Sequence, residues 1–196
     1  MNVNKEIMFE IPLLNNIDDL ISMSNTELQL YLDVLHGDNA HDPYTIKHLI
    51  INLTNCIELL IKFRLLEEHW AFIFEDVNKA NKESLDSGNF KSVNFNVGIE
   101  RLVNLCGISK HKYFSKSQKL YILRNKAVHF TLTESFKVVT TTILDSITEI
   151  NKFLRNEIIP YIQNKDAIED ISDHLDELLE LQADLRTAVV RLYSET

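Results

Sequence analysis

Hydrophobic residues recur every three or four positions over long stretches of this chain, which is the spacing of one buried face of an α-helix. The first long run of this kind consists of Ile46, Leu49, Ile50, Leu53, Ile57, Leu60 and Ile61. The same spacing continues through Leu65, Leu66, Trp70 and Phe72. One long helix, or two nearly collinear helices, is therefore predicted from Pro43 to about residue 72.

Two further runs of the same period lie in the C-terminal half. The first predicts a helix that ends before Pro160, and it consists of Phe136, Val139, Ile143, Ile147, Ile150 and Leu154. The second alternates strictly between three and four, as in a coiled-coil seam, at Ile168, Ile171, Leu175, Leu178, Gln182, Leu185, Val189 and Leu192. This last helix could pack on its own bundle, on the same helix of a second copy, or on another protein.

Helix starts are predicted from polar side chains that cap backbone N–H groups. Ser24 and Glu27 have the spacing of a capping box, which predicts a helix from residue 24 to about residue 36, after a short helix at 17–23. Asp42 followed by Pro43 predicts the next start, because proline suits the first position of a helix.

Two more capping boxes lie in the middle of the chain. Ser115 with Gln118 predicts that a helix starts near residue 115. Thr131 with Glu134 predicts that another helix starts directly after Phe130. The first of these helices would then end where the second begins.

The composition also indicates an all-α fold. Glycine (4) and proline (3) are scarce among 196 residues, which favours long helices joined by short loops. The main interruption lies at 80–95, where we expect an ordered loop with a short extended piece. Residues 97–106 then predict a short helix that ends at Gly107.

The length and polarity fit one soluble domain with an appendage. Hydrophobic residues make up 45% and charged residues 25% of the chain, which is ordinary for a globular protein. The N-terminus has no signal pattern, and no apolar run approaches the ~18 residues of a membrane-spanning helix. We therefore expect a cytoplasmic protein with no membrane partner. Cys56 and Cys106 are isolated, so neither a disulfide framework nor a zinc site is predicted.

Residues 120–130, with the sequence LYILRNKAVHF, place a polar cluster in an otherwise apolar helix. At about 100° per residue, one stripe holds the residues that we expect to face the core, Leu120, Leu123, Ala127 and Phe130. The other face holds Arg124, Asn125 and His129, with Tyr121, Ile122 and Val128. A face that mixes apolar and cationic groups is typical of a subunit interface that contains a polar site.

Charge is segregated along the chain. The net charge of −9 argues against a general nucleic-acid-binding protein. Residues 107–130 nevertheless hold six Lys or Arg and no acid, whereas residues 166–180 hold seven acids and no Lys or Arg. We predict that RNA approaches over Lys110, Lys112, Lys116, Lys119 and Lys126, with Tyr113 and Phe114 available for base stacking. The alternative is a solvated helix face.

Arg124, Asn125 and His129 suit RNA cleavage. A histidine can act as acid or base near neutral pH, and a helix C-terminus favours its charged form. Arg124 can hold a phosphate through two hydrogen bonds, while Asn125 can orient His129 or the ribose 2′-hydroxyl. No carboxylate accompanies them, so neither a metal nor another cofactor is predicted. Because Arg124 and His129 point about 140° apart on one helix, they converge only where two copies pair.

The segment Arg124 to His129, RNKAVH, resembles the Arg-polar-x-x-x-His version of the HEPN-domain motif, late in a helical bundle and before a further helix. The resemblance covers about residues 43–160. It implies a HEPN-like helical bundle over residues 1–160. Residues 161–196 would add an acidic C-terminal helix that packs on the bundle or on a partner.

The resemblance also implies an activity. HEPN proteins of this type are usually homodimeric, metal-independent endoribonucleases in toxin–antitoxin, antiphage-defence or CRISPR-associated systems. Arg124 and His129 would then be catalytic, Asn125 would be the polar residue after the arginine, and RNA and an antitoxin or other protein would be partners. In one subgroup an antitoxin modifies a tyrosine two positions after the histidine, but Thr131 stands there in this chain.

Two other interpretations stay open. Some HEPN members are non-catalytic RNA-binding or protein-assembly modules. In a purely structural interpretation, Arg124 caps a helix or forms a salt bridge between subunits, and His129 is hydrogen-bonded at a helix junction.

Overall fold

The computed structural model describes residues 10–36 and 43–194, and its regular structure there is helical, which confirms the all-α fold class. The α-helices are α1 (Leu13–His36), α2 (Pro43–Glu68), α3 (Lys82–Ser87), α4 (Phe95–Cys106), α5 (Lys110–Tyr113), α6 (Ser117–His129), α7 (Phe136–Phe153) and α8 (Lys165–Ser194). The only extended pairing in these two ranges is an isolated β-bridge between Phe74 and Ser92. No helix in them is both long enough and apolar enough to cross a membrane.

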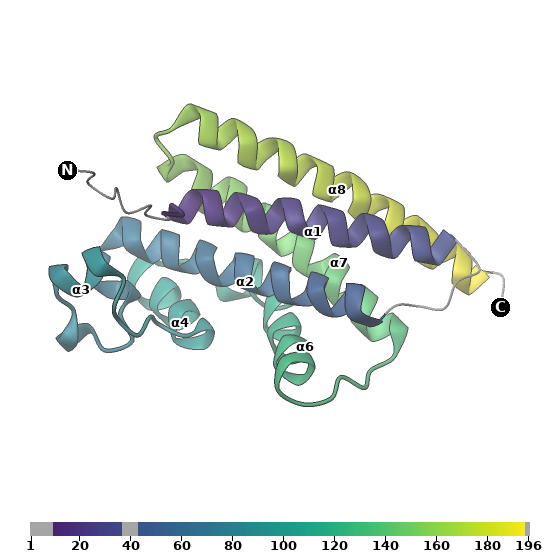
Figure 1. The fold of residues 1–196 in the computed structure, drawn as a ribbon, viewed down its shortest axis with the longest axis horizontal. Helices are drawn as coiled ribbons and strands as arrows, with labels where there is room; N and C mark the ends of the chain where they lie inside the picture. Colours follow the sequence, from purple (N-terminus) through teal and green to yellow (C-terminus); the bar gives the residue numbers. More distant parts are fainter. Residues whose placement is uncertain (1–9, 37–42, 195–196) are drawn as a thin grey trace, which may run out of the picture.

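The four longest helices form a bundle (Figure 1). Helix α1 packs against α2 on one side and α8 on the other, and α7 contacts both α2 and α8. The apolar positions of the sequence pattern face inward, and fully buried examples are Leu49, Leu60, Ile143, Ile147, Leu175 and Leu185. Burial of these side chains is the main favourable contribution to folding, so the period in the sequence was enough to locate α2, α7 and α8.

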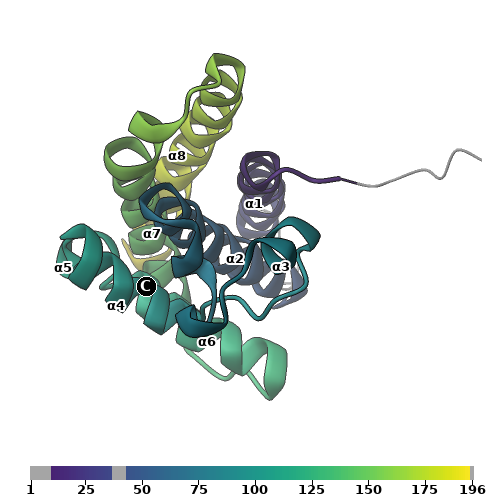
Figure 2. The same cartoon turned by 90° about the vertical axis from the view of Figure 1, so that its left-hand side faces the viewer.

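Helix α8 folds back along α1 and α7, and its buried side chains belong to the same hydrophobic core as those of the other helices. The polar position in its seam is also buried: the Gln182 side-chain amide donates to the backbone oxygen of Leu144 and, at 2.8 Å, to the Thr148 hydroxyl. The acid-rich first half of α8 lies at the top of both views, and α6 lies at the bottom (Figures 1 and 2). The acidic and basic tracts are therefore on different sides of the bundle.

Two predicted helix starts are wrong. Helix α1 runs without a break through Ser24, which is fully buried and whose hydroxyl donates to the Leu20 oxygen at 2.7 Å. Residues 131–135 form a loop, and α7 begins only at Phe136, where the Ser135 hydroxyl caps the helix by accepting from the Val138 N–H. Ser24 thus bonds back to its own helix and caps none, whereas at α7 the capping residue is Ser135 and not Thr131.

Other predicted boundaries are confirmed. Pro43 is the first residue of α2, although Asp42 lies outside the described residues. Helix α4 ends at Gly107, whose φ of 68° lies in the left-handed region. Helix α7 passes into a π-helical turn, Leu154–Ile158, just before Pro160.

The predicted continuation of α2 and the predicted loop at 80–95 are partly correct. Helix α2 ends at Glu68, and the apolar pattern continues in a separate 3-10 turn, Trp70–Ile73. The predicted loop contains the short helix α3, and its extended piece is the bridge at Ser92.

Candidate functional site

Helix α6, which carries the predicted catalytic residues, packs against α2 and α7 at the lower edge of the bundle (Figure 1). Its start is held by a carboxylate from α7. Glu149 is 5% exposed and accepts hydrogen bonds from the backbone N–H groups of Lys116 and Ser117, at 3.0 and 2.8 Å. The hydroxyls of Ser115 and Ser117 also donate to it, each at 2.8 Å. Ser115 therefore donates to Glu149 and does not cap the helix as predicted, and a negative charge stands at the positive end of α6.

The inward face of α6 is largely as predicted, with one exception. Leu120 and Leu123 are buried and Ala127 is half-buried, but Phe130 is 90% exposed. The helix ends at His129, and Phe130 has φ −154° and ψ −122°, so the chain has already left the helical path. The angular spacing that placed Phe130 inward applies only within a helix.

The outward face of α6 holds the three predicted catalytic residues. Arg124 and Asn125 are half-buried, and His129 is exposed at the last position of the helix. One terminal nitrogen of Arg124 donates to the Asn125 side-chain oxygen at 3.1 Å. Asn125 therefore contacts Arg124, whereas the sequence analysis predicted that it orients His129 or the ribose 2′-hydroxyl.

Arg124 has no counter-charge among the described residues, unlike Arg64 and Arg155. Its Nε is buried and has no hydrogen-bond partner, and no carboxylate among the described residues lies within 4 Å of its guanidinium. Arg64 and Arg155, in contrast, pair with Glu68 and Asp176. The Arg124 guanidinium consequently retains hydrogen-bonding capacity for an anion from outside the chain.

Exposed apolar side chains lie on the same segment as Arg124. Ile122 is 56% exposed, Val128 is 42% exposed, and Phe130 extends almost fully into solvent. Tyr121, by contrast, stacks on Phe95 of α4 with ring centroids 4.5 Å apart and is packed within the chain. Three exposed large apolar residues within nine positions are the pattern of a surface that another molecule covers.

The predicted RNA-approach lysines have different surroundings. Lys116 pairs with Asp145 at 3.1 Å, and Lys126 pairs with Glu134 at 2.5 Å. The Lys112 ammonium lies 4.5 Å from the centre of the Tyr113 ring. Lys110 and Lys119 are exposed and have no ion pair within the described ranges. The tract lacks acids in sequence, but the fold supplies them from the loop before α7 and from α7 itself.

The two aromatic residues predicted to stack on bases face the wrong way for that role. Tyr113 and Phe114 are buried and pack on Phe153, with ring centroids 5.5 and 4.9 Å away. The Tyr113 hydroxyl also donates to Glu157 at 2.8 Å. This prediction is wrong because α5 turns its aromatic side into the core against α7.

The sequence analysis missed a pocket between α6 and α7. It has a volume of about 280 Å³ and is lined by Lys116, Lys119, Lys137, Val138, Thr141, Thr142 and Asp145. Lys137 was missed because it belongs to a different helix from the basic tract. The available signal was that Lys137 and Thr141 lie one helical turn apart on α7, and therefore on one face.

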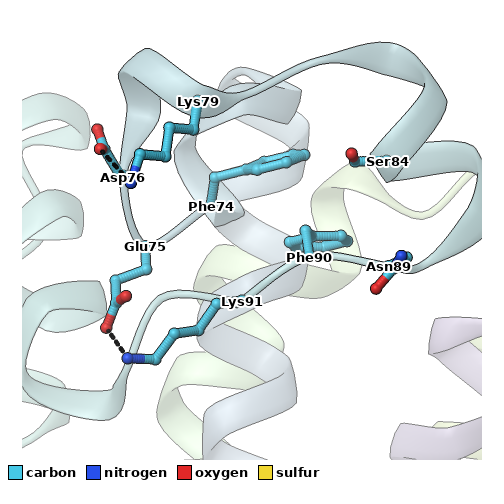
Figure 3. Close-up of a pocket in the computed structure, with 8 residues that line it drawn as sticks. All are labelled: Phe74, Glu75, Asp76, Lys79, Ser84, Asn89, Phe90 and Lys91. Atoms are coloured by element: carbon cyan, nitrogen blue, oxygen red, sulfur yellow. Dashed lines mark ion pairs between the residues drawn. The ribbon is translucent and has the colours of Figure 1, made fainter.

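A second pocket, of about 330 Å³, lies in the segment between α2 and α4 (Figure 3). Its charged residues neutralise one another, because Glu75 pairs with Lys91 at 2.8 Å and Asp76 pairs with Lys79 at 3.8 Å. Phe90 stacks on Phe74, with their ring centroids 4.2 Å apart. The paired charges and stacked rings indicate that these residues stabilise the fold of the segment.

Neither cysteine is poised as a nucleophile. Burial raises the pKa of the Cys56 thiol to about 12, and burial is also the main cause of a raised pKa at Cys106. A raised pKa leaves little thiolate near neutral pH. Within residues 10–36 and 43–194, no three His, Cys, Asp or Glu side chains gather as metal ligands would.

Comparisons of the chain with protein-family models, with curated proteins and with solved structures find no match. The function is therefore argued from the side chains and surfaces described above.

Proposed function

We propose that this protein is a metal-independent endoribonuclease of the HEPN type, which cleaves RNA at a site shared by two copies of the chain. The observation that carries the proposal is the state of Arg124. A half-buried guanidinium with an unpartnered Nε and no neighbouring carboxylate costs free energy unless an anion binds it. A phosphodiester in the site would supply that anion.

The reaction would proceed by attack of the ribose 2′-hydroxyl on the adjacent phosphorus. A histidine accepts the hydroxyl proton, the bond from phosphorus to the 5′ oxygen breaks, and a second histidine gives that oxygen a proton. His129 from each of two copies would fill these roles. Arg124 would bind the phosphate oxygens as negative charge grows on them, and Asn125 would position Arg124 through their hydrogen bond. The products would be a 2′,3′-cyclic phosphate and a 5′-hydroxyl.

Pairing of two copies is supported by the apolar rim of the site. Ile122, Val128 and Phe130 are exposed on the segment that carries Arg124 and His129. Covering them with a second α6 would remove apolar surface from water and bring two sets of catalytic residues together. The motif is typical of cytoplasmic toxins and antiphage-defence effectors, so an antitoxin or another protein would be the regulator.

A non-catalytic RNA-binding or protein-assembly module is the second candidate. Two observations favour its protein-assembly form: Lys116 and Lys126 are already paired with acids, and Tyr113 and Phe114 are buried. Both reduce the surface open to RNA near α6.

The test is cleavage of total RNA by the purified protein in EDTA. We expect products with cyclic phosphate ends, and we expect Arg124→Ala and His129→Ala each to reduce the rate at least ~100-fold. Arg186→Ala and His48→Ala, which alter exposed residues outside the motif and the basic tract, should cleave like the wild type. Equal cleavage by all variants would reveal a contaminating nuclease and overturn the proposal. Absence of cleavage by a folded wild-type dimer would leave the non-catalytic module as the function.

A further inference from the structure

The pocket between α6 and α7 gathers positive charge in an otherwise acidic protein. Of its seven lining residues three are lysines and one is an aspartate, so its formal charge is 3 − 1 = +2, whereas the whole chain carries −9. The lysines come from two helices: Lys116 and Lys119 lie at the start of α6, and Lys137 lies at the start of α7. Lysines that line one concavity from two helices give it a positive potential, which attracts an anion.

The neighbouring acids compensate this charge only in part. Asp145 pairs with Lys116 at 3.1 Å, and Lys119 has no ion pair in the described part of the chain. Lys137 lies over the Tyr193 ring, 5.6 Å from its centre, and likewise has no carboxylate within 4 Å there. The Glu149 oxygens accept from the four donors at the start of α6 and form no ion pair with Lys119 or Lys137.

The threonines add hydrogen-bonding groups to the charge. Thr141 is exposed one turn after Lys137, and its hydroxyl has no partner among residues 10–36 and 43–194. The Thr142 hydroxyl donates to the Val138 oxygen at 2.7 Å, which leaves its own oxygen as an acceptor only. Ammonium groups together with a hydroxyl donor match the oxygens of a phosphate group, and a pocket of about 280 Å³ has room for one phosphate with part of its sugar.

The pocket also lies at one end of a continuous helix stripe. Lys119, Ile122, Lys126 and His129 are spaced three, four and three residues apart, so they share one side of α6. Ten residues of helix at 1.5 Å each separate Lys119 from His129 by about 15 Å along the axis. A strand bound along this stripe would reach the pocket at one end and His129 at the other.

We propose that the pocket between α6 and α7 binds a backbone phosphate of the RNA strand that is cleaved at His129. The assignment of RNA as the ligand rests on the proposed function. It makes Lys137 and Thr141, which lie outside the motif and the basic tract, part of the RNA-binding surface.

The test is binding of a fluorescein-labelled 12-nucleotide single-stranded RNA, measured by anisotropy in EDTA, in the His129→Ala background so that the RNA stays intact. The pocket variant is Lys119→Ala with Lys137→Ala. The matched control is Lys152→Ala with Lys165→Ala, which removes the same charge from exposed positions of α7 and α8. We expect at least ~10-fold weaker binding for the pocket variant and less than ~3-fold for the control. The slope of log K against log salt should become shallower by ~0.7 for each phosphate that the variant no longer neutralises.

The outcomes separate this inference from the proposed function. Weaker binding by the pocket variant alone supports the pocket even if the wild type never cleaves RNA. Equal RNA binding by the pocket and control variants overturns the assignment of the pocket as a phosphate site, even if the wild type does cleave RNA. The competing source of a phosphate is a small nucleotide: if AMP binds as tightly as the 12-mer and the pocket variant loses AMP binding, the assignment to RNA is overturned. A melting temperature close to that of the parent confirms that the pocket variant is folded.

Discussion

At the scale of single residues, Glu149 determines where α6 begins. Its carboxylate is buried, yet four donor groups of residues 115–117 satisfy it, and it stands at the positive end of the helix dipole. A buried charge is tolerated where such partners surround it. The position of Arg124 and His129 along the bundle depends on this contact, because α6 starts where Glu149 receives its N–H groups.

We expect Glu149→Ala to lower the free energy of unfolding by about 3 kcal/mol, because two backbone N–H groups and two hydroxyls lose a charged acceptor. Glu149→Gln should cost less, since the amide keeps one accepting oxygen. Urea denaturation measures both changes. Glu169→Ala, an exposed substitution on α8, is the control and should change stability by less than ~0.5 kcal/mol. A cost below ~1 kcal/mol for Glu149→Ala would contradict the role assigned to this carboxylate.

At the scale of elements, the close approach of α4 to α2 supports α6. A Cβ atom on Gly98 would lie 2.7 Å from the Cγ2 atom of Ile61, so the two helices meet at a distance that only glycine permits. Helix α4 in turn provides Phe95, on which Tyr121 of α6 stacks. The outward face of α6 is therefore positioned through α4 as well as through α2 and α7.

Gly98→Ala should destabilise the protein by about 1–3 kcal/mol through overpacking, although alanine favours helix by about 1 kcal/mol over glycine. Destabilisation is expected to outweigh the gain in helix propensity because the branched side chain of Ile61 has little freedom to move aside. In the background of Ile61→Ala, the same substitution should become neutral or stabilising. Urea denaturation of the two single variants and the double variant measures this coupling. Additive effects would show that the contact with Ile61 is not the cause. Asn96→Ala, at an exposed position of α4, is the control.

At the scale of the whole molecule, the side chains of α8 and α6 are parts of one hydrophobic core. Leu178 of α8 and Leu120 of α6 are both fully buried in it, although the two helices lie on different sides of the bundle (Figures 1 and 2). A shared core makes separate unfolding of the acidic helix unfavourable, because its removal would expose the apolar face of α1.

Leu178→Ala and Leu120→Ala should each lower the free energy of unfolding by about 2–5 kcal/mol. Both should shift one and the same transition, followed by circular dichroism and by tryptophan fluorescence. Val190→Ala, at a position that is 63% exposed, should change stability by less than ~0.5 kcal/mol. Two transitions, of which Leu178→Ala shifts only one, would show that α8 unfolds as an independent appendage.

The long helices and the composition of the candidate site could be predicted from local sequence. The three-and-four spacing located α2, α7 and α8, because burying an apolar stripe requires that period whatever the partner helix is. Glycine at position 107 marked the end of α4, because the left-handed conformation there is set by local sterics. The placement of Arg124, Asn125 and His129 on the side of α6 away from Leu120 and Leu123 followed from helix geometry alone.

The contacts of those residues, in contrast, depend on how the helices pack. Glu149 of α7 accepts from the N–H groups at the start of α6. Glu134 and Asp145 pair with lysines of the basic tract. Lys137 of α7 and Lys119 of α6 line the same pocket. The exposed position of Phe130 follows from the end of the helix, and the burial of Tyr113 follows from contact with α7. These contacts involve residues that are distant in sequence or that lie outside a regular helix, so they cannot be predicted from local spacing. The surroundings of each side chain in the candidate site depend on such contacts.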